Sequence, residues 1–311
     1  MTAQPLALFG HDLFGEVVKP KPSGALASRF EFPPFSVLDA RGGEWQERKR
    51  AWCSLGMRGE EGRSAKSYHV NDWMQSAGGG QRGEGDGTSI FDPVLCELAY
   101  RWFAPRGGPV VDPFAGGSVR GLVAGLLGYR YWGCDLRAEQ IAANEAQRHI
   151  ASGADIEWVC GDALEAVDQR ERADFVFSCP PYGDLERYSD DPRDISTHEY
   201  HTFLANYRRV ILRCATALKQ DRFACFVVGD FRDRKTGNYR GFVADTIAAF
   251  RDVRMELYND AVLVTPCGSL PIRAGKQFDS GRKLGKTHQN VLVFVKGSPR
   301  EAARAAIGGA A

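Results

Sequence analysis

Four residues, Cys179-Pro180-Pro181-Tyr182, follow a short apolar run at 174–178 and are the part of this sequence best suited to chemistry. Two consecutive prolines stiffen the backbone and donate no hydrogen bonds, so nearby carbonyl oxygens are left as acceptors. A tyrosine beyond them can present a ring face for stacking. Acceptors aimed at the N–H bonds of a ring-conjugated amino group pull its nitrogen toward tetrahedral geometry and expose its lone pair. The pattern therefore favours a site that activates a weak amino nucleophile by positioning and electrostatics.

A glycine-containing turn lies between an apolar run at 109–112 and a predicted helix at 118–127. Glycine lets the backbone approach a ligand closely, and a helix start offers free N–H groups and a positive dipole end. We expect Ser118 to cap this helix. Asp135 ends the next apolar run, where a carboxylate would hold ribose hydroxyls. The turn predicts a nucleoside cofactor, and the spacing of Gly116, Ser118 and Gly121 is close enough to G-x-G-x-x-G that NAD is a rival here.

The elements that position these two sites alternate between β-rich and helical from residue 88 onward. The β-rich runs are 109–112, 131–134, 156–159, 175–178, 223–228, 255–264 and 290–295, and the helical stretches are 88–105 (starting near Ser89), 118–127, 137–151, 198–217 and 241–251. Such alternation predicts an α/β fold with a mostly parallel, seven-stranded sheet and helices on both faces. Because no helix separates the last two runs, we expect an antiparallel strand near the C-terminus.

Composition divides the chain into four parts. Residues 1–35 are Pro-rich and are predicted to form an arm, and residues 36–87 form an extension that ends in a Gly-rich linker at 76–87. Residues 88–297 form the α/β domain, and residues 298–311 form a tail predicted to be a short, fraying helix. The hydrophobic fraction of 43% excludes global disorder.

Charge and cysteine usage limit the partners. The formal net charge is +1, so any nucleic-acid-binding surface must be local. The eight cysteines include no C-x-x-C pair, which argues against a metal site and fits a reducing cytosol. We recognise no signal peptide and no run of apolar residues long enough to cross a membrane. We therefore expect a cytoplasmic protein that binds neither a metal nor a membrane.

Residues 88–182 resemble the core of the N4-cytosine and N6-adenine DNA methyltransferases. Asp112-Pro113-Phe114 and the glycines after it resemble the D-P-F-x-G-x-G motif of that family, although Gly117-Ser118 departs from the end of the motif. Cys179-Pro180-Pro181-Tyr182 resembles its Asp/Asn/Ser-Pro-Pro-Tyr signature. Residues 88–103 lie where the family has a further cofactor motif, and the whole chain looks like bacteriophage-type methylases of this group.

The resemblance implies a Rossmann-like methyltransferase fold, S-adenosylmethionine as cofactor, and methyl transfer to the exocyclic amino group of a flipped DNA base. It places the protein in a bacterial or phage-infected cytoplasm, in the context of restriction and modification. The cofactor-binding residues that it implies are Phe91, Asp92, Asp112, Pro113, Phe114, Gly116, Gly117, Ser118, Asp135, Leu136, Asp162 and Ala163, and the catalytic residues are Ser178, Cys179, Pro180, Pro181 and Tyr182.

Cys179 stands where the family has Asp, Asn or Ser. Cysteine is closest in shape to serine, which the family associates more with N4-cytosine, so cytosine is mildly preferred over adenine. A thiol is a weak acceptor, and Ser178 could replace it if the strand end is rotated. Alternatively, Cys179 is a covalent nucleophile, as in cytosine-C5 methyltransferases, although those place the cysteine after the proline. An RNA or other substrate, and a catalytically silent DNA-binding protein, also stay open.

The segment 265–289 is the candidate for target recognition. Its basic residues outnumber the single acid, Asp279, and its glycines predict a pliable loop that follows DNA phosphates. An ordinary hairpin is the alternative. The basic residues are Arg273, Lys276, Arg282, Lys283 and Lys286. The polar segment 183–196 after Tyr182 is either a lid over the base or a solvated loop.

Overall fold

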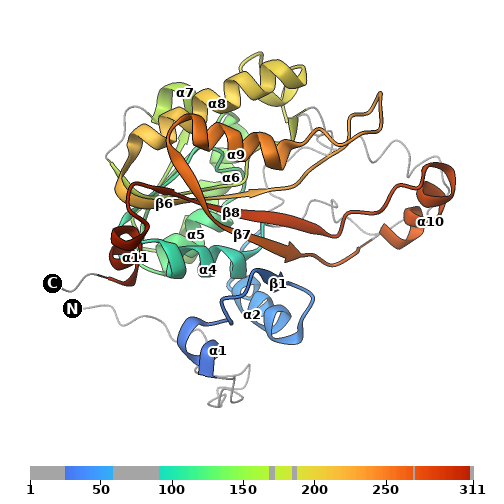
Figure 1. The fold of residues 1–311 in the computed structure, drawn as a ribbon. Helices are drawn as coiled ribbons and strands as arrows, with labels where there is room; N and C mark the ends of the chain where they lie inside the picture. Colours follow the sequence, from blue (N-terminus) through green and yellow to red (C-terminus); the bar gives the residue numbers. More distant parts are fainter. Residues whose placement is uncertain (1–24, 59–90, 168–171, 184–187, 269, 309–311) are drawn as a thin grey trace.

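The computed structural model describes residues 25–58, 91–167, 172–183, 188–268 and 270–308. Within them one eight-stranded sheet has the strand order β1-β7-β8-β6-β5-β2-β3-β4 (Figure 1). The strands are β1 (Val37–Asp39), β2 (Pro109–Asp112), β3 (Arg130–Asp135), β4 (Ile156–Cys160), β5 (Ala173–Ser178), β6 (Leu218–Val228), β7 (Met255–Val264) and β8 (His288–Lys296). Only β8 runs antiparallel to its neighbours, β6 and β7. The predicted Rossmann-like fold with a mostly parallel sheet is confirmed, but the strand count of seven is wrong.

Helices cover both faces of this sheet. The helices of the described residues are α1 (Ala25–Phe30), α2 (Gly43–Cys53), α4 (Pro93–Phe103), α5 (Val119–Leu126), α6 (Ala138–Ala146), α7 (Ala163–Ala166), α8 (Tyr200–Ala217), α9 (Phe242–Asp252), α10 (Leu270–Gly281) and α11 (Pro299–Ile307). Strand side chains alternate between two buried clusters, so that Phe175 and Phe177 join α4, α5 and α11, whereas Val176 joins α7, α8 and α9. This two-sided burial explains why the strands read as nearly continuous apolar runs.

The additional strand, β1, comes from the predicted N-terminal extension. It pairs in parallel with the edge of β7, and α2 follows it onto α4. Glu97 of α4 is fully buried and accepts hydrogen bonds from Arg48 Nε (2.7 Å) and Trp52 Nε1 (2.8 Å) of α2. Burial opposes the charge of Glu97, but Arg48 and Trp52 outweigh it and lower the pKa of the carboxyl. Residues 37–53 are therefore part of the domain.

Helix ends near the glycine turn differ from the prediction. The helix α4 begins at Pro93, and Asp92 caps it by accepting from the backbone N–H groups of Val94 and Leu95; the predicted start near Ser89 lies outside the described residues. Ser118 does not cap α5, because its backbone is already helical and its buried hydroxyl has no partner among the described residues.

The segment 265–289 is not a continuous loop. Its centre forms α10, which Figure 1 shows standing away from the body beyond the ends of β7 and β8. The tail is confirmed as a short helix, α11, capped by Ser298. Residues 1–24 of the predicted arm and the predicted linker at 76–87 lie outside the described residues. Within the described ranges, no helix has the length and apolar character needed to span a bilayer, and no group of His, Cys, Asp and Glu is suited to hold a metal.

Candidate active site

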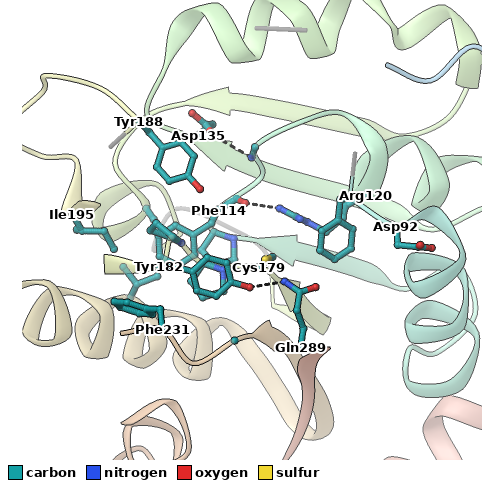
Figure 2. Close-up of a pocket in the computed structure, with 18 of the residues that line it drawn as sticks. Asp92, Phe114, Arg120, Asp135, Cys179, Tyr182, Tyr188, Ile195, Phe231 and Gln289 are labelled. Carbon is teal, nitrogen blue, oxygen red and sulfur yellow. Dashed lines mark hydrogen bonds between the residues drawn. The ribbon is translucent and has the colours of Figure 1, made fainter. Parts of the chain in front are cut away.

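A cavity of about 680 Å³ opens at the carboxyl ends of β2, β3 and β5. Its volume is within the range of small-molecule and cofactor sites, and its position is the one where ligands bind in open α/β sheets. Both predicted sites contribute to it, which joins the glycine turn to the Cys-Pro-Pro-Tyr loop (Figure 2). The predicted residues that line it are Phe91, Asp92, Pro113, Phe114, Gly116, Asp135, Leu136, Asp162, Ala163, Cys179, Pro180, Pro181, Tyr182 and Lys286.

Asp135 and the glycine turn form one end of the cavity. Gly116 has a φ of +51°, a conformation that favours glycine, and its N–H donates to Asp135 Oδ2 at 3.1 Å. The other oxygen, Oδ1, accepts from the Arg137 N–H at 2.9 Å. Burial raises the pKa of the Asp135 carboxyl. Each oxygen keeps a lone pair for a hydroxyl donor, so Asp135 can accept hydrogen bonds from a ribose.

Asp162 lies beside it at the end of the neighbouring strand. Its Oδ1 caps the short helix α7 by accepting from the Leu164 N–H at 2.9 Å. The preceding residue, Gly161, donates its N–H to the Asp135 carbonyl at 3.0 Å, which ties the two strand ends together. The Oδ2 atom of Asp162 has no partner among the described residues and can accept from a ligand amino group.

Asp112 does not line the cavity. It is fully buried, and each of its oxygens accepts two hydrogen bonds: Oδ1 from Phe114 N and Ser178 Oγ, and Oδ2 from Arg120 Nε and Tyr131 Oη. The predicted direct contact of Asp112 with a cofactor is therefore corrected, because the carboxylate has no lone pair left for a ligand.

Arg120 connects this buried carboxylate to the turn. It bonds the carbonyls of Phe114 and Ala115 through Nη2, at 2.5 and 2.9 Å, and its Cζ lies 4.6 Å from the centre of the Phe91 ring. Burial opposes the charge of Arg120, but the Asp112 carboxylate outweighs it and raises the pKa of the guanidinium. The pair Asp112–Arg120 thus fixes the shape of the glycine turn.

Asp92 also serves the structure. Besides capping α4, it accepts from Trp45 Nε1 at 3.2 Å and pairs with Lys49 Nζ at 3.1 Å. Both Asp92 and Lys49 line the cavity, so the α2 segment closes its wall. Lys49 was not among the predicted site residues.

Tyr182 lies at the other end of the cavity, and its ring is held by one hydrogen bond and two ring contacts. Its hydroxyl accepts from Gln289 Nε2 at 2.7 Å, and its ring meets Phe231 and Phe242 edge-on, with centroids 6.3 and 6.2 Å away. Figure 2 shows Tyr182, Cys179, Phe231 and Gln289 drawn together at this end. No hydrogen bond within the described ranges ends on the Pro180 carbonyl. In the described part of the chain, the loop therefore offers an aromatic ring held in place and a backbone carbonyl that accepts no hydrogen bond.

The two residues before the prolines differ in their surroundings. Cys179 is partly exposed and lines the cavity, whereas Ser178 is fully buried and donates to Asp112 at 2.6 Å. The predicted substitution of Ser178 for Cys179 is wrong, since the strand end is not rotated and the Ser178 hydroxyl supports Asp112 instead. Gly117 and Ser118 are likewise not among the residues that line the cavity.

The described part of segment 183–196 lines the cavity through Tyr188, Arg193, Asp194 and Ile195. The charge of Asp194 acts on Asp135, and that of Asp162 acts on Arg193, so this segment returns to the end of the cavity where Asp135 lies. The polar sequence of this segment was compatible with a lid, but it did not indicate which end of the cavity the segment would approach.

The predicted basic residues separate into two groups. Lys286 lines the cavity, whereas Lys276, Arg282 and Lys283 are exposed. Arg282 Cζ lies 5.1 Å from the centre of the Phe278 ring. Arg273 lies in α10.

Comparison with known proteins gives no family-model match and no match among curated proteins. Solved structures with a similar fold include TrmN from Thermus thermophilus (14% identity, 66% of this chain, 49% of that chain, TM-score 0.43). A putative RNA methyltransferase from Pyrococcus horikoshii has 15% identity over 66% of this chain and 82% of its own (TM-score 0.43). Magnesium protoporphyrin IX methyltransferase from Synechocystis PCC 6803, solved with bound SAM, has 11% identity over 74% of this chain and 92% of its own (TM-score 0.45). This chain thus spans about half of TrmN, and the likeness concerns the fold alone.

Proposed function

We propose that this protein is an S-adenosylmethionine-dependent DNA methyltransferase that modifies the exocyclic amino group of a flipped base, with N4 of cytosine mildly preferred over N6 of adenine. One observation carries the proposal: the glycine turn with its acids and the Cys-Pro-Pro-Tyr loop open into the same cavity. A nucleoside cofactor and a flipped base can then lie in contact, which is what direct group transfer between them needs.

The acids of the cavity fit this cofactor. Asp135 has acceptor capacity for the ribose hydroxyls, and Asp162 has a free oxygen for the adenine amino group. Gly116 lets the backbone approach the ligand closely. When bound, the cofactor supplies an electrophilic methyl group on a sulfonium.

The other end of the cavity fits the acceptor base. The Tyr182 ring can stack on a base, and its fixed orientation lowers the cost of placing that base. The free Pro180 carbonyl can accept from the amino group, which orients the nitrogen lone pair toward the cofactor. These residues act by positioning and electrostatics, and Cys179 is assigned as a packing residue beside the amino group.

Product identification tests the proposal. The purified chain is given methyl-labelled cofactor with DNA or with RNA of the same sequence, and the digested nucleosides are identified by mass spectrometry. N4-methylcytosine or N6-methyladenine from DNA alone is the expected result. Label in RNA alone would move the activity to RNA, and 5-methylcytosine would make Cys179 a covalent nucleophile. Tighter binding of NAD than of S-adenosylhomocysteine would contradict the cofactor assignment.

Replacing Asp135 by asparagine should weaken cofactor binding. The amide keeps the size but loses the charge that strengthens hydrogen bonds from ribose hydroxyls, so we expect a loss of about ten- to a hundred-fold in affinity for S-adenosylhomocysteine. The raised pKa of Asp135 adds a pH signature: in the native protein the affinity falls as the pH is lowered and the carboxyl takes up a proton. Calorimetry at several pH values measures both the loss of affinity and its pH dependence. The asparagine variant should not show the fall in affinity at low pH. An unchanged affinity would remove Asp135 from the binding site.

Replacing both Arg282 and Lys283 by alanine should weaken DNA binding without changing the cofactor site. Both side chains are exposed and stand apart from the cavity lining. Loss of two phosphate contacts lowers the slope of log affinity against log salt concentration by up to about two. Titration of fluorescent duplex at several salt concentrations measures the slope, with exposed Arg304 of α11 replaced by alanine as control. An unchanged slope would place this segment away from DNA.

A further inference from the structure

A lysine stands at the end of the cavity assigned to the base. Lys286 lies just before β8 and lines the cavity with Tyr182, Gly229 and Gln289. A Cβ atom placed on Gly229 would lie 3.6 Å from Lys286 Cε and 3.7 Å from the Tyr182 hydroxyl oxygen. The end of the Lys286 side chain and the Tyr182 ring therefore both lie beside Gly229 in the cavity wall.

The ammonium of Lys286 forms no ion pair with a carboxylate in the described parts of the chain. Its Nζ is 5.8 Å from the centre of the Tyr239 ring. Asp230, which also lines the cavity, is near enough for its carboxylate to favour the charged ammonium, and its Oδ1 accepts from the backbone N–H groups of Phe231, Gly241 and Phe242.

This placement differs from that of a phosphate-binding lysine. Lys286 is half-buried, and burial lowers the pKa of its ammonium, whereas Lys283 three residues earlier is exposed. Burying part of a charge without a close ion-pair partner is costly, and a ligand that supplies acceptors within the cavity would offset that cost. The ligand of Lys286 is therefore expected inside the cavity.

We propose that Lys286 determines base specificity by donating a hydrogen bond to the Watson–Crick ring nitrogen of the flipped base. This inference rests on the proposed function and names the residue that reads its substrate. An ammonium only donates. The matching nitrogen, N3 of cytosine or N1 of adenine, only accepts, and it is bonded to the carbon that carries the amino group. Thymine and guanine carry an N–H at this position and would oppose the ammonium.

The assignment also explains how the protein recognises both the amino group and the ring nitrogen next to it on the base. Among the described residues, the Pro180 carbonyl accepts no hydrogen bond and Lys286 forms no ion pair, so the first can accept from the amino group and the second can donate to the ring nitrogen beside it. Reading a flipped base by hydrogen bonds to this edge, with stacking on an aromatic ring, is a general means of selection. Tyr182, held by Gln289, supplies that ring.

A deaza substitution tests the contact. Once the modified site has been identified from methylated DNA, duplexes are made with the natural target base or with its analogue in which the Watson–Crick ring nitrogen is replaced by C–H. The native protein, Lys286→Met and the matched exposed control Lys283→Met are compared in kcat/KM on both duplexes. Calorimetry with S-adenosylhomocysteine confirms that each variant keeps its cofactor site.

Lys286→Met should lower kcat/KM on the natural base by about ten- to a hundred-fold, the effect of losing a charged hydrogen bond. It should lose nothing further on the analogue, whereas the native protein and Lys283→Met should both be sensitive to the analogue. Two losses that multiply would overturn the inference, as would a Lys286 variant that changes only the salt dependence of DNA affinity. If the native protein methylates no DNA, the proposed function fails first, and this inference fails with it.

Discussion

Tyr182→Ala should lose about ten- to a hundred-fold in kcat/KM for methyl transfer, the range expected for removing one base–aromatic stack. The ring is held by the hydrogen bond from Gln289 and by edge contacts with Phe231 and Phe242, so it provides a prepared surface for the base. The glycine turn and its acids lie at the other end of the cavity. Affinity for S-adenosylhomocysteine should therefore change by no more than a few fold.

Tyr182→Phe is the matched control. It keeps the ring and its edge contacts and removes the hydroxyl that accepts from Gln289, so its rate should stay close to that of the native protein. Steady-state kinetics give the rates, and calorimetry gives the cofactor affinity of the same preparations. If Tyr182→Ala loses cofactor binding and activity in equal measure, the loop is structural and the base pocket lies elsewhere. Pro181→Ala should follow Tyr182→Ala, because it loosens the backbone that carries the ring.

The meeting of the two motifs was predictable from sequence because of the fold class. In a parallel sheet the carboxyl ends of the strands share one edge, so residues after β2, β3, β4 and β5 had to converge. Gly116, Asp135, Asp162 and Tyr182 all line one cavity as a result. The alternation of strands and helices was sufficient for this conclusion, and it needed no knowledge of side-chain contacts.

The role of Asp112 was not predictable in the same way. Its partners Arg120, Tyr131 and Ser178 come from three different elements, and nothing local to the turn indicates that they converge on one carboxylate. A buried acid at a strand end and an acid facing a ligand have the same sequence pattern. Only the packed structure distinguishes them, since it shows which lone pairs are occupied.

Among the elements that escaped prediction, β1 and α10 have weak local signals. The strand β1 has three residues, too few for a period of two to be recognised. The helix α10 contains glycines, which lower helix propensity, so its segment was predicted to be a pliable loop. Lys286 was grouped with the exposed cations by charge alone, and its place in the cavity wall followed from the position of β8 beside β6.

Arg120→Met should destabilise the protein by about 3–5 kcal/mol, because it leaves the fully buried Asp112 carboxylate without its cation. Methionine keeps the aliphatic part of the arginine side chain and removes the guanidinium, with its hydrogen bonds and its contact with the Phe91 ring. Urea unfolding at neutral pH measures the difference. The control is Arg304→Met, which removes an exposed ion pair with Glu301 and should change stability by less than about 1 kcal/mol.

The size of this difference identifies its cause. Removing one partner of a buried ion pair leaves the other charge uncompensated, which costs several kcal/mol, whereas an exposed ion pair contributes about 1 kcal/mol at most. A loss in Arg120→Met no larger than that in Arg304→Met would contradict the assignment of Asp112 and Arg120 as the charged pair that fixes the glycine turn.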